Sequence, residues 1–203
     1  MAKLIHDQSM AKKKISEFAG HAKKLAGYKE RISLKGITED QKKQYLSLFD
    51  MSYDKAVQCI AEIGISAVDT DDTRKGLESV LGVTHVRVNN LIEEIGRLGQ
   101  SNLKSAIQCY VKAYAAIDAL EERLDKSFVV EKSTALAEFY VPILIKTLDS
   151  NYTPNNKAVV MSRINSFRKK GVDVKPYINT IIGIIRKHVD YNHKENPAQK
   201  SET

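Results

Sequence analysis

The sequence predicts an all-α protein, a multi-helix bundle of about six to eight helices built on one long central amphipathic helix. The first indication is the stretch of residues 83–128, which contains no proline and repeats apolar side chains with a helical period. The second is that no run of alternating β-branched residues lies between turn signals, as a strand would require. The third is a series of helix start and stop signals on both sides of this stretch.

The central stretch carries one apolar stripe. The first and last positions of this stripe lie 36 residues apart and are joined by ten steps, which gives 3.6 residues per step, the period of a straight helix. The positions are Val88, Ile92, Ile95, Leu98, Leu103, Ile107, Tyr110, Tyr114, Ile117, Leu120 and Leu124. We therefore expect a helix over about residues 84–127. Glycines at 96 and 99 require a five-residue step in the stripe, which favours a break or kink near Gly96–Gly99 over a continuous rod.

Two helices are expected before this stretch. Residues 7–33 place Phe18 and Leu25 on one face and lysines on the other, which is typical of a surface helix. The next helix begins at Thr38, where Gln41 three residues later completes a capping box, and ends at Gly64. Because the loop between them is short, the two helices should be antiparallel neighbours.

Three helices are expected after it. Residues 130–148 are the most apolar, and Pro142 should kink or restart this helix. Thr153 and Pro154 form a start signal for a helix that runs to about residue 170. A last helix covers about residues 176–189. We expect one helical domain over residues 1–190 and a disordered polar tail over residues 191–203.

The charge is distributed unevenly along the chain. The formal net charge of +7 divides into +6 for residues 1–35, −5 for residues 36–150 and +6 for residues 151–203. Basic ends around an acidic middle are explained either by a basic surface that binds an acidic polymer or by attraction between the ends and the centre of one fold. Lysines that are merely solvated on the outer faces of helices are the simplest alternative.

The charge pattern favours a non-enzymatic, helical nucleic-acid-associated protein that binds the phosphate backbone through its basic N- and C-terminal segments. The candidate nucleic-acid-binding residues are Lys12, Lys13, Lys14, Lys23, Lys24, Arg163, Arg168, Lys169, Lys170, Lys175, Arg186 and Lys187. The alternative is a protein-protein interaction or assembly protein, such as an adaptor, inhibitor or structural subunit, which uses an amphipathic helical face and associates with itself or a partner.

A shorter segment bears on DNA recognition. The run Leu81-Gly82-Val83, followed by Val88 and Leu91, is similar to the helix-turn-helix of phage-repressor type, in which glycine makes the turn between two helices. The segment departs from that motif at Glu78, where a small residue is usual. The resemblance implies that the side chains facing the major groove are Thr84, His85, Arg87, Asn89 and Asn90.

The remaining motifs give little chemistry. The sequence Asp69-Thr70-Asp71-Asp72-Thr73 resembles the DxDDT motif of class II terpene cyclases, in which an aspartic acid protonates an alkene. This motif is the basis of a minor alternative, an all-α enzyme of unrecognised type; the simpler interpretation is that these residues cap the next helix. We expect no cofactor and no metal, because Cys59 and Cys109 have no ligand spacing around them. Two such cysteines and the lack of a signal peptide or membrane span favour the cytoplasm.

Overall fold

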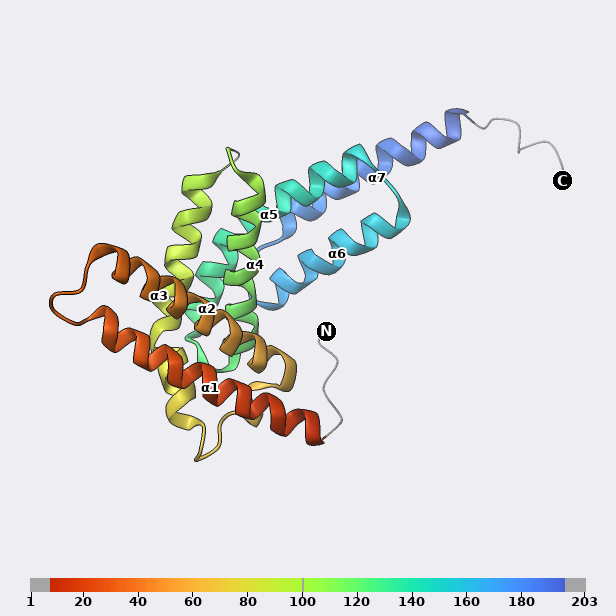
Figure 1. Ribbon diagram of the computed structural model, residues 1–203. Helices are drawn as coiled ribbons and strands as arrows, with labels where there is room; N and C mark the ends of the chain where they lie inside the picture. The colour runs from red at the N-terminus through yellow and green to blue at the C-terminus, as the bar shows by residue number, and fades with distance from the viewer. Residues whose placement is uncertain (1–7, 100, 196–203) are drawn as a thin grey trace. The chain divides into compact units, whose positions relative to one another are not determined.

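The computed structural model describes residues 8–99 and 101–195. Over these residues the chain forms seven α-helices and two short 3-10 helices, with no strand, so the predicted all-α bundle of six to eight helices is confirmed (Figure 1). The chain divides into two compact units, residues 1–129 and residues 130–203. The single helical domain expected over residues 1–190 stays a prediction.

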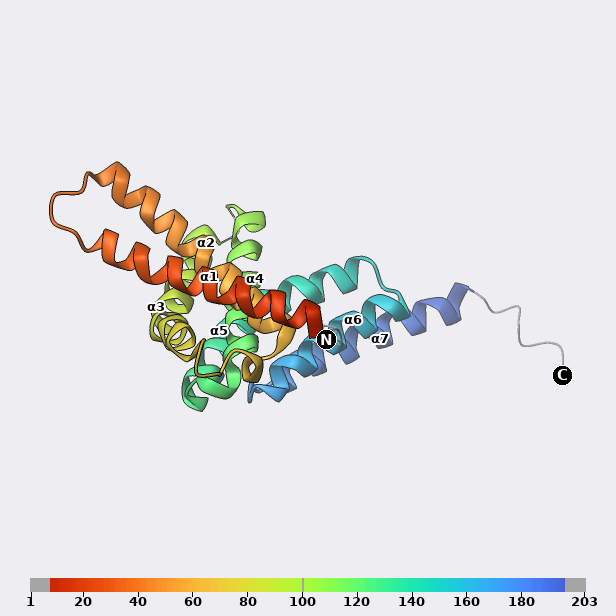
Figure 2. The ribbon, with the colours of Figure 1, turned by 60° about the horizontal axis from the view of Figure 1, so that its bottom comes forward.

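The first unit begins with an antiparallel hairpin of α1 (Gln8–Ile32) and α2 (Glu39–Ile63), as the short loop predicts (Figure 2). The predicted capping box is present at the start of α2. The Gln41 backbone N–H donates to Thr38 Oγ1 at 3.2 Å, and the Thr38 N–H donates to Gln41 Oε1 at 3.0 Å. Gly64 ends α2 with a φ of 86°, and the 3-10 helix η1 (Ile65–Ala67) follows.

The predicted central helix is a second hairpin, of α3 (Arg74–Leu98) and α4 (Leu103–Leu120). The expected break is confirmed: Gly99 has a φ of 46°, and Asn102 Oδ1 accepts from the Ser105 N–H at 3.2 Å. The predicted bounds of 84 and 127 are wrong. The first helix starts at Arg74. The second ends at Leu120 and is followed by the 3-10 helix η2 (Glu121–Arg123).

The helix-turn-helix expected around Gly82 is also wrong, because this glycine lies inside α3. The helix buries Leu77, Val80, Val88 and Leu91 on one continuous face that passes through the glycine. One exposed helical glycine costs only about 1 kcal/mol, which is less than the burial of that face contributes. The motif therefore presents no second helix, and the segment has no recognition-helix geometry.

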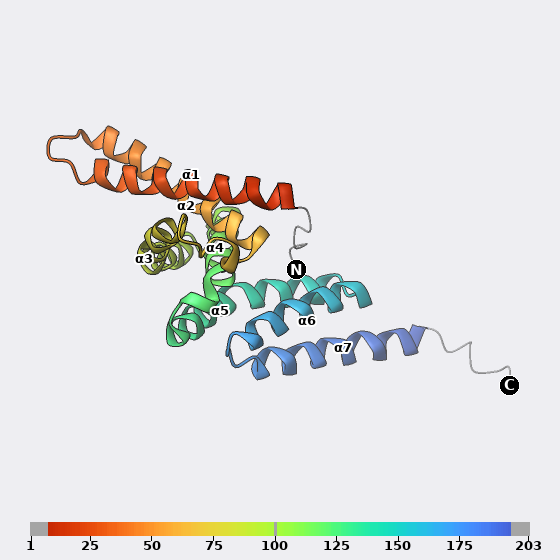
Figure 3. The same ribbon diagram turned by 90° about the horizontal axis from the view of Figure 1, so that it is seen from below.

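The two hairpins cross steeply, with α1 packed on α3 and α2 packed on α4 (Figure 3). At the α1–α3 crossing, a Cβ added to Gly76 would lie 2.9 Å from Ala22 Cβ and 3.5 Å from the ring of Phe18, so only glycine fits. Tyr53 of α2 reaches α3, where its hydroxyl donates to Thr84 Oγ1 at 3.0 Å. The core of the first unit therefore lies where the hairpins cross.

The second unit contains most of α5 (Lys126–Ser150) together with α6 (Pro154–Lys169) and α7 (Lys175–Glu195), which lie side by side in Figures 1 and 3. The predicted start signal of α6 is confirmed, because Thr153 Oγ1 accepts from the Asn156 N–H at 3.0 Å. The helix α5 does not restart at Pro142 but continues through it. The predicted polar tail overlaps the end of α7, and its residues 196–203 lie outside the described residues.

Replacing Gly82 by alanine is expected to raise the free energy of unfolding by up to about 1 kcal/mol, because the glycine is exposed in mid-helix and an added Cβ meets nothing within 4 Å. Urea denaturation followed by circular dichroism measures the change. The matched change Gly76→Ala gains the same helical propensity but overpacks the α1–α3 crossing at a cost of about 1–3 kcal/mol. If the Gly82→Ala protein were less stable than the unchanged protein, the result would support a turn at Gly82, as the repressor-type motif requires.

Candidate functional site

The predicted basic residues of the first unit lie on α1, and most of them face the solvent. Lys12, Lys13, Lys23 and Lys24 are exposed, on the side of the helix opposite the buried Phe18. Lys12 and Lys23 share one row and Lys13 and Lys24 share another, because a spacing of 11 residues is close to three helical turns. Among the described residues, no carboxylate forms an ion pair with any of these four lysines.

Lys14 is different, because it faces α2 and is paired with two carboxylates. Its Nζ lies 2.8 Å from Glu17 Oε2 and 3.0 Å from Glu62 Oε2. The hydrogen bonds to Glu17 and then Glu62 raise the pKa of Lys14 well above its ordinary value. This lysine joins the two helices of the first hairpin, so its charge is already matched within the fold.

The predicted basic residues of the second unit divide into exposed and buried groups. Exposed side chains are found on α6 at Arg163, Arg168 and Lys169, and on α7 at Lys175, Arg186 and Lys187. Lys170, at the end of α6, is only 5% exposed, so it does not present its charge at the surface. Lys187 Nζ contacts Asp149 Oδ1 at 3.0 Å, and His188 lies against the same carboxylate and stacks on Tyr152.

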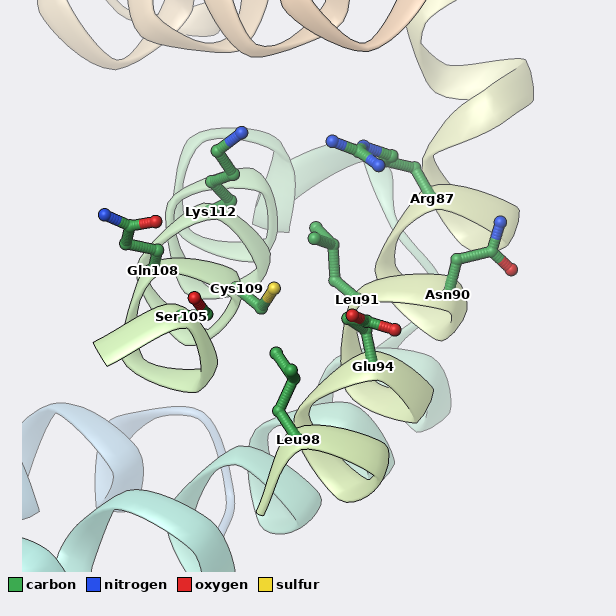
Figure 4. Close-up of a pocket in the computed structure, with 9 residues that line it drawn as sticks. All are labelled: Arg87, Asn90, Leu91, Glu94, Leu98, Ser105, Gln108, Cys109 and Lys112. Carbon is green, nitrogen blue, oxygen red and sulfur yellow. The ribbon is translucent and has the colours of Figure 1, made fainter. Parts of the chain in front are cut away.

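A groove of the first unit lies between α3 and α4 (Figure 4). It has a volume of about 440 Å³. Leu91, Leu98 and Cys109 point into the space between the two helices, whereas Arg87 and Lys112 stand at one end. The remaining lining residues are polar: Asn90, Glu94, Ser105 and Gln108.

Two carboxylates of α2 neutralise the cations at the end of this groove. Arg87, whose side chain is 13% exposed, lies 3.0 Å from Asp50 Oδ2 and 3.6 Å from Asp54 Oδ1. Lys112 of α4 lies 2.7 Å from the other oxygen of Asp54. Two cations and two carboxylates from three helices therefore balance one another, which leaves no net charge there to attract an ion.

The groove also lacks an activated nucleophile. Burial raises the pKa of the Cys109 thiol, and the nearby Glu94 raises it further, so the thiol stays protonated at neutral pH. Within residues 8–99 and 101–195, no group of three or more His, Cys, Asp or Glu side chains is arranged to hold a metal ion. Both Cys59 and Cys109 are free thiols.

The aspartate-rich segment before α3 forms a turn that holds the start of this helix. Asp69 pairs with Arg74 at 3.4 Å and with Arg123 of η2, so its carboxylate is occupied. Thr73 occupies the N-cap position, but its hydroxyl donates to the Val68 carbonyl at 2.6 Å and does not cap the helix N–H groups. Asp69 lines a hollow together with Leu77 and Leu81, and its carboxylate is paired there with two arginines.

Two of the five residues that repressor-like recognition would use, Thr84 and Arg87, have structural roles in α3. Thr84 is fully buried, and its hydroxyl donates to the Val80 carbonyl at 2.8 Å. Arg87 belongs to the ion-pair network with α2. The sequence reasoning missed this network; the one local signal was the spacing of four residues between Asp50 and Asp54, which places both carboxylates on one face of a helix.

No known protein family, curated protein or solved structure matches this chain. None of the helices in the part of the chain that the structure describes is long and apolar enough to cross a membrane.

Replacing Arg87 by methionine is expected to lower the free energy of unfolding by about 1–3 kcal/mol, because Asp50 and Asp54 then lose the guanidinium that satisfies them in a partly buried site. Urea denaturation of the full chain measures the loss. The control is Arg97→Met, which removes the same charge from an exposed pair with Glu94 and should change stability little. Equal losses of unfolding free energy in the two variants would show that the ion pairs of Arg87 contribute no more to stability than an exposed pair does.

Asp50 gives a pH dependence of definite sign. Burial raises the pKa of its carboxyl even though Arg87 opposes the shift. A pKa raised by folding means that this carboxyl contributes stability below the ordinary aspartate pKa of about 3.9, and that the contribution is lost as the pH rises through the folded value. As the pH rises from about 3 to 7, the free energy of unfolding of the Asp50→Asn protein should therefore increase relative to that of the unchanged protein.

The measurement is the difference in unfolding free energy between the two proteins at several pH values. Asp72→Asn, which changes an exposed carboxyl, supplies the control for the loss of one formal negative charge. A relative loss of stability in Asp50→Asn as the pH rises would mean that the attraction to Arg87 outweighs burial.

Proposed function

We propose that the protein binds nucleic acid without catalysis, through contacts between the phosphate backbone and the exposed lysines of α1. The observation that carries this proposal is the set of four outward-facing lysines, Lys12, Lys13, Lys23 and Lys24, that no carboxylate neutralises among the described residues. A cationic surface of this kind attracts a polyanion and releases its counterions.

The distribution of ion pairs supports this explanation over attraction between the basic ends and the acidic middle. Among the described residues of α1, only Lys14 pairs with a carboxylate of the middle segment, Glu62. In the second unit, Lys187 pairs with Asp149 of that segment. Most of the cations that were candidates for such internal attraction remain at the surface, where their charge is available to a partner.

The exposed cations of α6 and α7 are proposed as a second contact region for the same ligand. Arg168 and Lys169 stand at the C-terminal end of α6, where the helix dipole favours a cation with or without a ligand. For this reason α1, which carries its lysines along its whole length, supports the proposal more strongly.

The two free cysteines agree with a reducing compartment, and we propose that the protein is cytoplasmic.

The double change Lys13→Gln/Lys24→Gln is expected to weaken binding of a labelled 30-base-pair duplex and to make it less sensitive to salt. Each phosphate contact contributes about 0.9 to the slope of log affinity against log salt, so the slope should fall by about 2. Fluorescence anisotropy at several salt concentrations measures both the affinity and its dependence on salt. The range is about 50 to 200 mM, over which phosphate contacts change the affinity strongly.

The control is Lys104→Gln/Lys126→Gln, which removes two exposed lysines elsewhere in the first unit and changes the net charge equally. It should leave the slope nearly unchanged. If the unchanged protein binds neither duplex nor single strands at the lowest salt concentration, the proposed function is wrong.

A second candidate is assembly with a protein partner or with another copy of this chain. It is favoured by a row of aliphatic residues on α4, in which Leu103 is 39% exposed and Val111 is 55% exposed. Static light scattering distinguishes this candidate, because self-association predicts a mass above 22.8 kDa that falls on dilution.

A further inference from the structure

The closed end of the α1–α2 hairpin extends past the core of the first unit. From residue 26 to residue 51 no side chain is buried, whereas the flanking Leu25 and Tyr53 are each 1% exposed. Figures 1 and 3 show this end projecting beyond α3 and α4. A pair of helices without a third layer cannot cover its own apolar groups, so Leu34 and Leu46 are 60% and 43% exposed.

This hairpin end, defined here as residues 24–46, is basic. Six cationic side chains and three carboxylates give it a formal net charge of +3: Lys24, Lys29, Arg31, Lys35, Lys42 and Lys43 against Glu30, Glu39 and Asp40. Within the described residues, none of these cations forms an ion pair. All six are exposed, so the hairpin end presents its charge directly to the solvent.

Two tyrosines join the helices within this basic region. The rings of Tyr28 on α1 and Tyr45 on α2 stack with centroids 6.3 Å apart and planes 27° apart. The guanidinium of Arg31 lies over Tyr45, 5.6 Å from the ring centroid. Both rings are half-buried and Arg31 is exposed, so part of this row of three planar groups stays accessible.

Planar groups among unpaired lysines are suited to a ligand that combines aromatic faces with phosphates. A base stacks on a tyrosine ring or a guanidinium, and the backbone that follows it contacts lysines. A protein partner fits less well, because the centres of protein interfaces are depleted in lysine. A lipid surface also fits less well, because an interfacial helix needs a broad apolar face and this end exposes mainly Leu34 and Leu46.

We infer that the hairpin end binds single-stranded nucleic acid, with unpaired bases stacked on the outer, uncovered faces of the row formed by Tyr28, Tyr45 and Arg31 and with phosphates on the neighbouring lysines. This inference rests on the proposed nucleic-acid binding and specifies its ligand. In a duplex the base faces are covered by their neighbours in the stack, so the aromatic groups add affinity only for unpaired strands. The lysines of α1 contribute to both ligands.

The test compares a labelled 30-nucleotide oligothymidine with a 30-base-pair duplex, using the full chain and fluorescence anisotropy at one low salt concentration. One stacked base contributes about 1–3 kcal/mol, so Tyr28→Leu/Tyr45→Leu should weaken single-strand binding at least fivefold and leave duplex binding within twofold. Tyr28→Phe/Tyr45→Phe keeps the rings and should restore single-strand affinity. Tyr152→Leu, a half-buried tyrosine of the second unit, is the matched control and should change neither affinity.

Three results would overturn the inference. Equal losses for duplex and single strand would mean that the tyrosines only support the helix pair. Unchanged single-strand affinity in the leucine double variant would mean that no base stacks there, while the proposed phosphate binding stands. Binding to vesicles of anionic phospholipid that is lost on Leu34→Ser, with no binding to either oligonucleotide, would replace both proposals with a lipid surface.

Discussion

The close contact of α1 and α3 at Gly76 determines where the first hairpin can lie. The backbones approach so closely that a single methyl group on Gly76 would meet Ala22 at 2.9 Å. This contact and the neighbouring Phe18 hold α1 at its middle, whereas the half of α2 that follows Met51 docks on α3 and α4 through Tyr53 and Asp54. A helix of 25 residues is about 37 Å long, so anchoring at one part leaves the closed end of the hairpin outside the core.

The same packing explains why the outer face of α1 stays cationic. Each cation that points inward has carboxylates beside it: Arg87 contacts Asp50 and Asp54, and Lys14 contacts Glu17 and Glu62. Placing an unpaired charge there would carry a desolvation penalty, so the acids are needed at those positions. The acidic middle of the sequence is thus partly used to match inward-facing cations. Outward-facing lysines of α1 carry no such penalty, and within residues 8–99 and 101–195 no carboxylate forms an ion pair with Lys12, Lys13, Lys23 or Lys24.

Local signals made much of the helical architecture predictable. The capping box at Thr38, the Thr153-Pro154 start and the break near Gly99 each depend on residues within a few positions of one another. Gly82 was interpreted wrongly because a glycine between aliphatic residues looks the same in a turn and on the exposed side of a helix; the difference lies in what the other side of α3 packs against.

The candidate site was less predictable, since its features depend on pairs that are distant in sequence. Nothing near Asp50 indicates that Arg87 will lie 3.0 Å from it, and the charge of Lys170 reveals nothing of its burial. Composition alone did identify α1 as basic. What it missed at the hairpin end is the pairing of Tyr28 with Tyr45, which requires knowing that the two helices are antiparallel and in which register.

The exposed end of the hairpin has a cost that its own residues reduce. Accessible leucines and aromatic rings favour self-association, but the lysines around them keep such a surface soluble through mutual repulsion between copies. Stacking of Tyr28 on Tyr45 and of Arg31 above it also limits the conformations of these side chains before any ligand arrives. Side chains that are already ordered lose little entropy on binding. A stacked aromatic pair on an otherwise unsupported hairpin is therefore better suited to contact with a ligand than to a role in the core.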